Sequence, residues 1–491
     1  NNIVTNEGLT TSKTQFDVVT YTGNGGTTQK LGGPVFSSSA DSGLTHADGV
    51  TGMFDGSLST RGGAPSTDNS YKTLTDGASI SASTGIRIYW NGVGAGQRYI
   101  RINGTTELDD GSAALTPGWS TQSSFSGTIN KIEVKTASSG SWSLAAVEVD
   151  GTILIDGTGP GLKFQPDLIW LKGRSYSISH LLYDSVRGYG ADKELVPNGT
   201  NAEGAAGADS TYGYVSAVDS SGFTVEGGSD ADNGYTNKTN ATYVAWCWKA
   251  GGTAVSNSDG SITSSVSANA QYGFSIVSYT GNGTDNATFG HGLNKVPELI
   301  IVKNRSSADD WFVYTKSTEG NILKLNSTEA KGSSSHFRTM TSSTFQLSGN
   351  ADVNANNSNF IAYCFANVPG YQRIGSVATG SDPVVITGFK PRFLLTKKIQ
   401  GSEHWFLHDS ERDPDDDDNT TTFEANNANA EESGANRKVK FLDNGFQLVG
   451  ADVDVSGGTT IYWAIGDDEI GSDEDCLVDV PNAVTADADA T

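Results

Sequence analysis

Cysteine is scarce in this chain, and long apolar runs are missing. The 491 residues include three cysteines, Cys247, Cys364 and Cys476. Cys247 and Cys364 hold equivalent positions of a repeat that has Ala464 at the third, so we interpret this position as small and buried. Cys476 has no evident mate, and three thiols make no disulfide framework, which leaves the compartment open. No apolar run approaches about 18 residues, which predicts no transmembrane segment.

Basic residues are also few, and the deficit is uneven along the chain. The sequence has 32 Lys and Arg against 56 Asp and Glu, a formal charge of −24. Residues 400–491 alone hold 23 acidic and 4 basic residues. A surface of this sign repels phosphate backbones, so we expect no nucleic-acid partner. Apolar residues make up only 36%, yet aromatic residues at 9% still allow packed cores.

Recognisable catalytic motifs are missing as well. The sequence has no Walker loop, no nucleophile elbow, no His-Glu-x-x-His and no CxxC. Carboxylates are plentiful, so a glycosidase pair stays open, but nothing singles out any pair. We therefore predict a non-enzyme and assign no catalytic, cofactor-binding or metal-binding residues.

Glycine is abundant, with 60 residues, and it separates many short strand-like runs. One run occurs three times, at residues 164–172, 295–303 and 389–397. In each copy a proline precedes an apolar stretch that ends in lysine; these residues are Pro166 and Lys172, Pro297 and Lys303, and Pro391 and Lys397. Proline suits the start of a strand and not its middle. The branched and aromatic residues that follow predict a strand buried on both faces.

These copies predict an all-β chain of three tandem β-sandwich-like repeats, the first interrupted by an inserted β-sandwich domain of lectin-like type. Residues 16–25 are nearly repeated at 274–283. In the first copy, however, a long inserted stretch separates this motif from the proline-led strand. The expected segments are an N-terminal arm (1–15), the first repeat (16–33 plus 161–250), the insert (34–160), a linker (251–272), the second repeat (273–370), the third repeat (371–467) and an acidic tail (468–491).

An acidic turn recurs at the same place in each repeat and is the best repeated candidate for a site. The pairs are Asp230/Asp232, Asp352/Asn354 and Asp452/Asp454. Two such oxygens are ligands that Ca²⁺ accepts, but no copy completes a twelve-residue calcium loop with a closing Glu. We favour an Asx turn, in which the side chain bonds its own backbone, and leave Ca²⁺ binding open.

Three further candidates favour structural interpretations. The acidic run 413–418 predicts a solvated loop, with cation capture as the alternative. His404 and His408 stand four apart in an expected strand, which places both on one face, but a Zn²⁺ site needs more ligands. Four tryptophans could stack on sugar rings if they were exposed. We favour the alternative, in which they pack within strands. They are Trp246, Trp248, Trp311 and Trp405.

Several motifs occur together in the repeats. Tyr-Thr-Gly-Asn-Gly stands at 21–25 and 279–283, the proline strands follow, and Tyr-Val-Ala-Trp-Cys-Trp stands at 243–248. In this combination the chain resembles large structural proteins encoded by bacteriophages of marine bacteria, cyanobacterial phages among them. The resemblance covers most of residues 14–30 and 160–467. The third repeat departs most, with Arg392 where an acidic residue usually begins the strand.

The resemblance implies a virion structural protein on the exterior surface, a tail fibre or projection for host attachment. A capsid decoration or knob-type protein is the alternative. A host-glycan depolymerase is a further one, although the long parallel β-helix periodicity of such enzymes is absent. The expected partners are other virion proteins of the tail or capsid, further copies of this chain with a trimer favoured, and a host cell-surface glycan or protein. We expect no membrane insertion, and the acidic tail suggests a longer parent chain.

Overall fold

Strands make up nearly all of the regular structure in the computed structural model, which confirms the all-β prediction. The residues that the structure describes are 15–23, 25, 28–32, 62–64, 70–93, 96–114, 117–137, 142–150, 152–153, 162, 164–219, 222–230, 234–318, 320–334, 336–380, 382–414, 419–454 and 457–466. The predicted N-terminal arm, apart from residue 15, lies outside these ranges. So do the tail from residue 467, Cys476 and Asp232.

The chain divides into two compact units. The first comprises Asn1–Phe16, Leu195–Glu203 and Lys249–Thr491, and the second comprises Asp17–Glu194 and Gly204–Trp248. The short segment Leu195–Glu203 belongs in sequence to the first repeat but packs with the unit that holds the second and third repeats.

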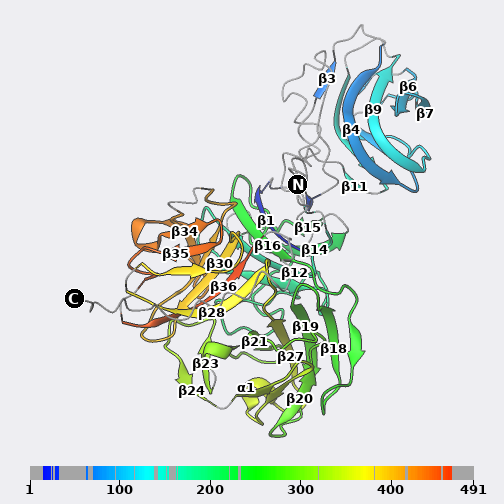
Figure 1. Cartoon of the computed structure of the whole chain (residues 1–491). Coiled ribbons are helices and arrows are strands. Elements are labelled where there is room, and N and C mark those ends of the chain that lie inside the picture. The colour runs from blue at the N-terminus through cyan, green and yellow to red at the C-terminus, as the bar shows by residue number, and fades with distance from the viewer. Residues whose placement is uncertain are drawn as a thin grey trace, which may run out of the picture. The chain divides into compact units, whose positions relative to one another are not determined.

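Two antiparallel sheets form the inserted domain. One sheet orders β11 (Thr152–Ile153), β10 (Trp142–Val149), β5 (Ile86–Gly92) and β8 (Gly118–Trp119), with β3 (Gly62–Ala64) paired to β10. The other orders β4 (Lys72–Ala82), β9 (Gly127–Thr136), β6 (Arg98–Ile102) and β7 (Thr106–Gly111). Figure 1 shows β4 and β9 as long, curved neighbours. Both sheets supply one shared core, with Trp90 from the first and Ile132 from the second, so the domain is a sandwich.

The first repeat joins strands from both sides of the insert. Its larger sheet orders β1 (Phe16–Thr22), β16 (Thr242–Trp248), β12 (Leu168–Gly173) and β13 (Leu181–Asp184). Its smaller sheet orders β14 (Tyr214–Asp219), β15 (Gly222–Glu226) and β2 (Thr28–Gly32). β1 and β2 precede the insert in sequence, yet their sheet partners follow it.

The second repeat has the largest sheet. This sheet orders β17 (Val255–Asn257), β18 (Ser264–Asn269), β19 (Phe274–Thr280), β27 (Asn359–Phe365), β21 (Leu299–Asn304), β22 (Trp311–Thr315), β23 (Asn321–Lys324) and β24 (Gly332–Ser333). A smaller sheet orders β20 (Ala287–Gly290), β26 (Thr344–Leu347) and β25 (Phe337–Met340). The repeat also contains the α-helix α1 (Ala351–Asn354) and the 3-10 helix η2 (Lys316–Thr318).

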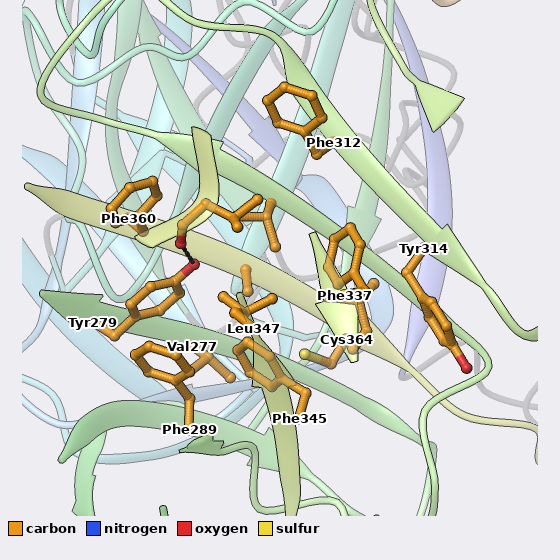
Figure 2. Close-up of a cluster of buried hydrophobic side chains, with 14 of the residues drawn as sticks. Val277, Tyr279, Phe289, Phe312, Tyr314, Phe337, Phe345, Leu347, Phe360 and Cys364 are labelled. Carbon is orange, nitrogen blue, oxygen red and sulfur yellow. Dashed lines mark hydrogen bonds between the residues drawn. The ribbon is translucent and has the colours of Figure 1, made fainter. Parts of the chain in front are cut away.

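An aromatic core fills the space between the two sheets of the second repeat (Figure 2). Tyr279 from β19 stacks on Phe360 from β27, with ring centroids 5.1 Å apart. Its ring also lies 4.1 Å from that of Phe289, which comes from the smaller sheet. The buried Tyr279 hydroxyl donates to the carbonyl oxygen of Val353 at 2.8 Å, so the polar end of the ring is satisfied.

The third repeat has the same two-sheet plan. Its larger sheet orders β28 (Gln372–Ala378), β36 (Thr459–Ile465), β30 (Phe393–Lys398), β31 (Trp405–Asp409), β32 (Thr421–Glu424) and β33 (Glu432–Ser433). Its smaller sheet orders β29 (Val384–Ile386), β35 (Gly445–Leu448) and β34 (Val439–Leu442), and the 3-10 helix η3 spans Ala435–Arg437.

The proline-led runs form the equivalent strands β12, β21 and β30, as predicted. Each strand starts two residues after its proline and is hydrogen-bonded on both sides, and nearly every residue is buried. The predicted small packing position is also confirmed, because Cys247, Cys364 and Ala464 are all fully buried.

The prediction of a linker at residues 251–272 is wrong. This segment forms β17 and β18, which extend the large sheet of the second repeat beyond β19. Val266 and Ser267 of β18 are buried. A Ser/Thr-rich composition suggested flexibility, but backbone bonds to β17 and β19 hold β18, in which three residues are buried and two of these are serines.

Candidate functional site

The lysine near the end of each proline-led strand is buried. Lys172, Lys303 and Lys397 are at most 1% exposed. Each ammonium donates to the carbonyl oxygen of the next residue, at 2.9, 2.7 and 2.9 Å in chain order. Burial lowers the pKa of Lys303 and of Lys397 to about 8. Backbone carbonyls therefore take the place of water around these ammonium groups.

Lys303 also bonds the segment Leu195–Glu203 of the first repeat. Its Nζ lies 3.3 Å from the carbonyl oxygen of Thr200. Trp311, directly opposite Lys303 on β22, donates its indole N–H to the carbonyl oxygen of Val196 at 2.9 Å. The Lys303 ammonium and the Trp311 indole therefore bond two carbonyl oxygens that lie four residues apart on one loop.

The third repeat uses the same arrangement on the second repeat. Lys397 Nζ donates to the carbonyl oxygen of Thr328 at 3.1 Å. Trp405, opposite Lys397 on β31, donates its indole N–H to the carbonyl oxygen of Lys324 at 2.9 Å. We call each such set of a lysine, a tryptophan and two loop carbonyls a Lys–Trp junction. The interpretation of the four predicted tryptophans as packing residues is confirmed by burial, but the role of these two indole donors was missed.

A second repeated feature lies where the strand after the proline strand ends. In the first repeat the buried Asp184 and Arg187 form an ion pair at 2.5 Å, and in the third Asp409 and Arg412 do so at 2.6 Å. The second repeat has Thr315 and Thr318 at this place, with their hydroxyls 3.0 Å apart. All three repeats therefore have a bond between side chains three residues apart at this place. The bonded groups are charged in the first and third repeats and neutral in the second.

The acidic turns of the second and third repeats bond groups elsewhere in their own repeat. Asp352 lies 2.7 Å from His336 Nε2. Asn354 Oδ1 accepts from the backbone N–H of Asn282 at 3.0 Å. In the second repeat these side chains therefore bond partners distant in sequence, and not their own backbone as the favoured Asx turn would require.

The third acidic turn follows the same principle. Asp454 accepts from the backbone N–H groups of Gly380 and Asp382, at 2.7 and 2.8 Å. Asp452 lies 3.7 Å from Arg437 Nε. In the ranges that the structure describes, no group of three or more His, Cys, Asp or Glu side chains is placed to hold a metal ion.

The two histidines of the third repeat bond different groups, and only His408 lies within a strand. His404 precedes β31, and its Nδ1 lies 3.3 Å from Glu424 Oε2. His408 is fully buried in β31, and its Nε2 lies 2.7 Å from the carbonyl oxygen of Arg437. Burial lowers the pKa of His408 to about 4. Its imidazole is therefore a neutral core group at neutral pH.

Most of the acidic run lies outside the described residues, which stop at 414 and resume at 419. Asp413, at its start, accepts from the backbone N–H groups of Thr420 and Thr421 at 2.9 and 3.0 Å. This carboxylate therefore helps to close its own loop.

A row of tyrosines and cations lies on the outward face of the β4-β9-β6-β7 sheet of the insert. Lys135 Nζ is 4.5 Å from the ring centroid of Tyr71 and 4.7 Å from that of Tyr99. Arg101 lies 3.7 Å from the Tyr71 centroid and forms a two-point ion pair with Glu133 at 2.7 and 2.6 Å. Such cation–π contacts hold the rings and the charges in fixed positions. We call these five residues the tyrosine–cation face.

Sequence reasoning missed this face, although a signal was present. The alternation in β6 sends Ile100 and Ile102 into the core, and therefore sends Tyr99 and Arg101 outward. The other sheet of the insert carries a smaller version, in which Arg87 lies 4.6 Å from the Trp119 centroid.

Residues 147–468 match the family model of DUF7483, a domain of unknown function, over more than half of the chain. The chain therefore belongs to this family. Searches of curated proteins and of solved structures found no match. No helix in the described parts of the chain is long and apolar enough to cross a membrane.

Proposed function

We propose that the protein is a non-enzymatic structural component of a bacteriophage virion, a tail fibre or surface projection for host attachment. The observation that carries this proposal is the repeated Lys–Trp junction. Buried charged and indole donors hold the second repeat to a loop of the first, and the third repeat to the second. A junction repeated in this way suits a part of the virion that must resist mechanical force. The virion setting comes from the resemblance to phage structural proteins.

The tyrosine–cation face is the surface we propose for host contact. Its half-buried rings and fixed charges suit a polar cell-surface ligand, because tyrosine offers an apolar ring together with a hydrogen-bonding hydroxyl. Tyr99 and Lys135 are the two residues to test first, because Lys135 lies near both tyrosine rings.

Immunogold electron microscopy of virions with an antibody against the purified protein tests the proposed location. We expect label on the tail or on projections from it. Label confined to the capsid shell would replace the tail fibre with a capsid decoration, and purified virions without label would overturn the proposal.

Binding of the labelled protein to host cells tests the proposed contact face. We expect Tyr99→Ala and Lys135→Ala to reduce binding at least fivefold. Thr128→Ala, an exposed position on the same sheet in β9, is the matched control and should bind as the parent does. Equal binding by all three variants would remove the tyrosine–cation face from the proposal.

A further inference from the structure

The strand β29 lies at the open edge of the small sheet in the third repeat. Its middle residue, Val385, is buried, whereas Val384 and Ile386 are 51% and 61% exposed. Large β-branched side chains are rarely left in this state at a sheet edge, where charged residues or proline usually discourage pairing. β29 itself contains no charged residue.

The backbone of β29 is also available on its outer side. Leu448 donates to the carbonyl oxygen of Pro383 at 3.2 Å, and Thr387 donates to that of Asn444 at 3.1 Å. In an antiparallel ladder this register turns the N–H and C=O groups of Val384 and Ile386 away from β35. No described residue bonds these outward groups.

The second repeat shows how the fold covers the same edge. Its strand β20 is the equivalent of β29, and Thr288 corresponds to Val384, since each lies opposite the Gln of a Phe-Gln-Leu strand. The segment that holds Ser261 and Ile262 runs along this edge. Ile262 N–H donates to the Thr288 carbonyl oxygen at 3.1 Å. Ser261 Oγ accepts from the Thr288 N–H at 2.9 Å.

The covering segment has a recognisable chemistry. It lies in the connection between β17 and β18, where a serine that bonds the edge is followed by a β-branched residue, Ile262, which packs against the core of the second repeat. The chain supplies it from the segment 251–272. Between β27 and β28 only residues 366–371 are present, so the third repeat has no matching segment before its first strand.

We propose that β29 is completed by an extended segment of a partner chain, in which Ser or Thr is followed by a β-branched aliphatic residue. The partner's backbone would bond the outward groups of Val384 and Ile386 as an added strand, and its aliphatic side chain would pack on the core side beside Val385, as Ile262 does beside Phe289. This inference goes beyond the proposed host attachment and does not depend on it.

A labelled peptide with the sequence of residues 260–266, Gly-Ser-Ile-Thr-Ser-Ser-Val, is a direct probe, because it is the segment that covers the equivalent edge. Fluorescence anisotropy with the full-length protein should show saturable binding. Ile386→Lys, which charges the edge, and Val384→Pro, which removes an outward N–H, should each weaken binding at least tenfold. Val255→Lys, at an exposed valine of the edge strand β17, is the matched control and should bind normally.

The results separate the possible occupants. Absence of saturable binding, or binding that Ile386→Lys leaves unchanged, would overturn the inference. Analytical ultracentrifugation of the peptide-free protein adds a second measure. Self-association that Ile386→Lys abolishes would also overturn it, because a second copy of this chain would then be the occupant. Circular dichroism should show the parent spectrum for both β29 variants, because both positions are more than half exposed.

Discussion

The second and third repeats share one plan but differ in their buried polar chemistry. Both carry a Lys–Trp junction with nearly identical bond lengths. At the strand end, however, the second repeat uses two threonine hydroxyls where the third uses the Asp409–Arg412 ion pair. The backbone at this point therefore requires a bond across three residues, and either a neutral or a charged pair provides it.

The two repeats also differ at neighbouring positions. Tyr314 of the second repeat corresponds to the buried His408 of the third, so at this position the third repeat has an imidazole where the second has a phenol. The equivalent sheet edges differ too, because one is covered and the other is exposed. The repeats therefore share their strand arrangement, while their buried polar groups and the exposure of their sheet edges differ from copy to copy.

Breaking the buried ion pair should give the largest effect. Arg412→Ala leaves the fully buried Asp409 carboxylate without its guanidinium, and we expect a loss of about 4 kcal/mol. Thr318→Ala, the matched change in the second repeat, should cost about 1 kcal/mol because only a neutral hydrogen bond is lost. Native-state hydrogen exchange resolves the stability of each repeat.

A double change to threonine, Asp409→Thr with Arg412→Thr, should recover much of the loss, because it copies the second repeat. Equal losses from Arg412→Ala and Thr318→Ala would contradict the comparison.

His408 should make the third repeat sensitive to acid. The folded pKa of His408, about 4, lies below its ordinary value of 6.5. Between these values the unfolded chain binds a proton that the folded chain does not, so stability falls as pH falls. At pH 4.5 the loss should be about 2 to 3 kcal/mol relative to pH 7.5.

His408→Tyr, which copies the second repeat, should remove this part of the pH dependence. Urea unfolding of the parent and the variant at both pH values is the measurement. Parallel pH profiles for the two proteins would rule out His408 as the cause.

The junction lysines should act in the alkaline range. The pKa of Lys397 is lowered from 10.5 to about 8, so the unfolded chain holds more protons between these values and stability rises with pH. From pH 7 to pH 10 the gain should be about 2 to 3 kcal/mol. Lys397→Met should lose this gain, while Lys440→Met, at a half-buried lysine on β34, should keep it. Denaturant unfolding at the two pH values compares them.

The smallest expected effect concerns the indole donors. Trp405→Phe keeps most of the ring but loses the bond to the Lys324 carbonyl, which should cost about 1 kcal/mol. Trp311→Phe should cost the same, because its bond to Val196 has the same length. Thermal unfolding of both variants measures these losses. A threefold difference between the two losses of unfolding free energy would show that the two junctions are not equivalent.

Strands led by proline could be predicted from sequence because their signal is local. A proline and one charged residue, followed by four apolar or branched residues and a lysine, specify a buried strand wherever the partners lie, and β12, β21 and β30 follow this rule. The small buried position at Cys247 could also be predicted, because comparison of the three copies reveals the side-chain size that the position accepts.

The partners of the polar residues could not be predicted, because they depend on loops distant in sequence. Nothing near Lys303 indicates that its ammonium binds Thr200, and Asp352 gives no local sign of His336. The strands β17 and β18 were missed for a related reason. Their bonds are mainly between backbones, which leave little pattern in side-chain polarity.

The position of β36 within its sheet has a mechanical consequence. This last strand of the third repeat is hydrogen-bonded to β28 on one side and to β30 on the other. Tension applied to the chain beyond Ile465 along the strand would have to shear two ladders at once, whereas an edge strand such as β1 can detach from a single neighbour. The third repeat is therefore the stronger anchor point under tension.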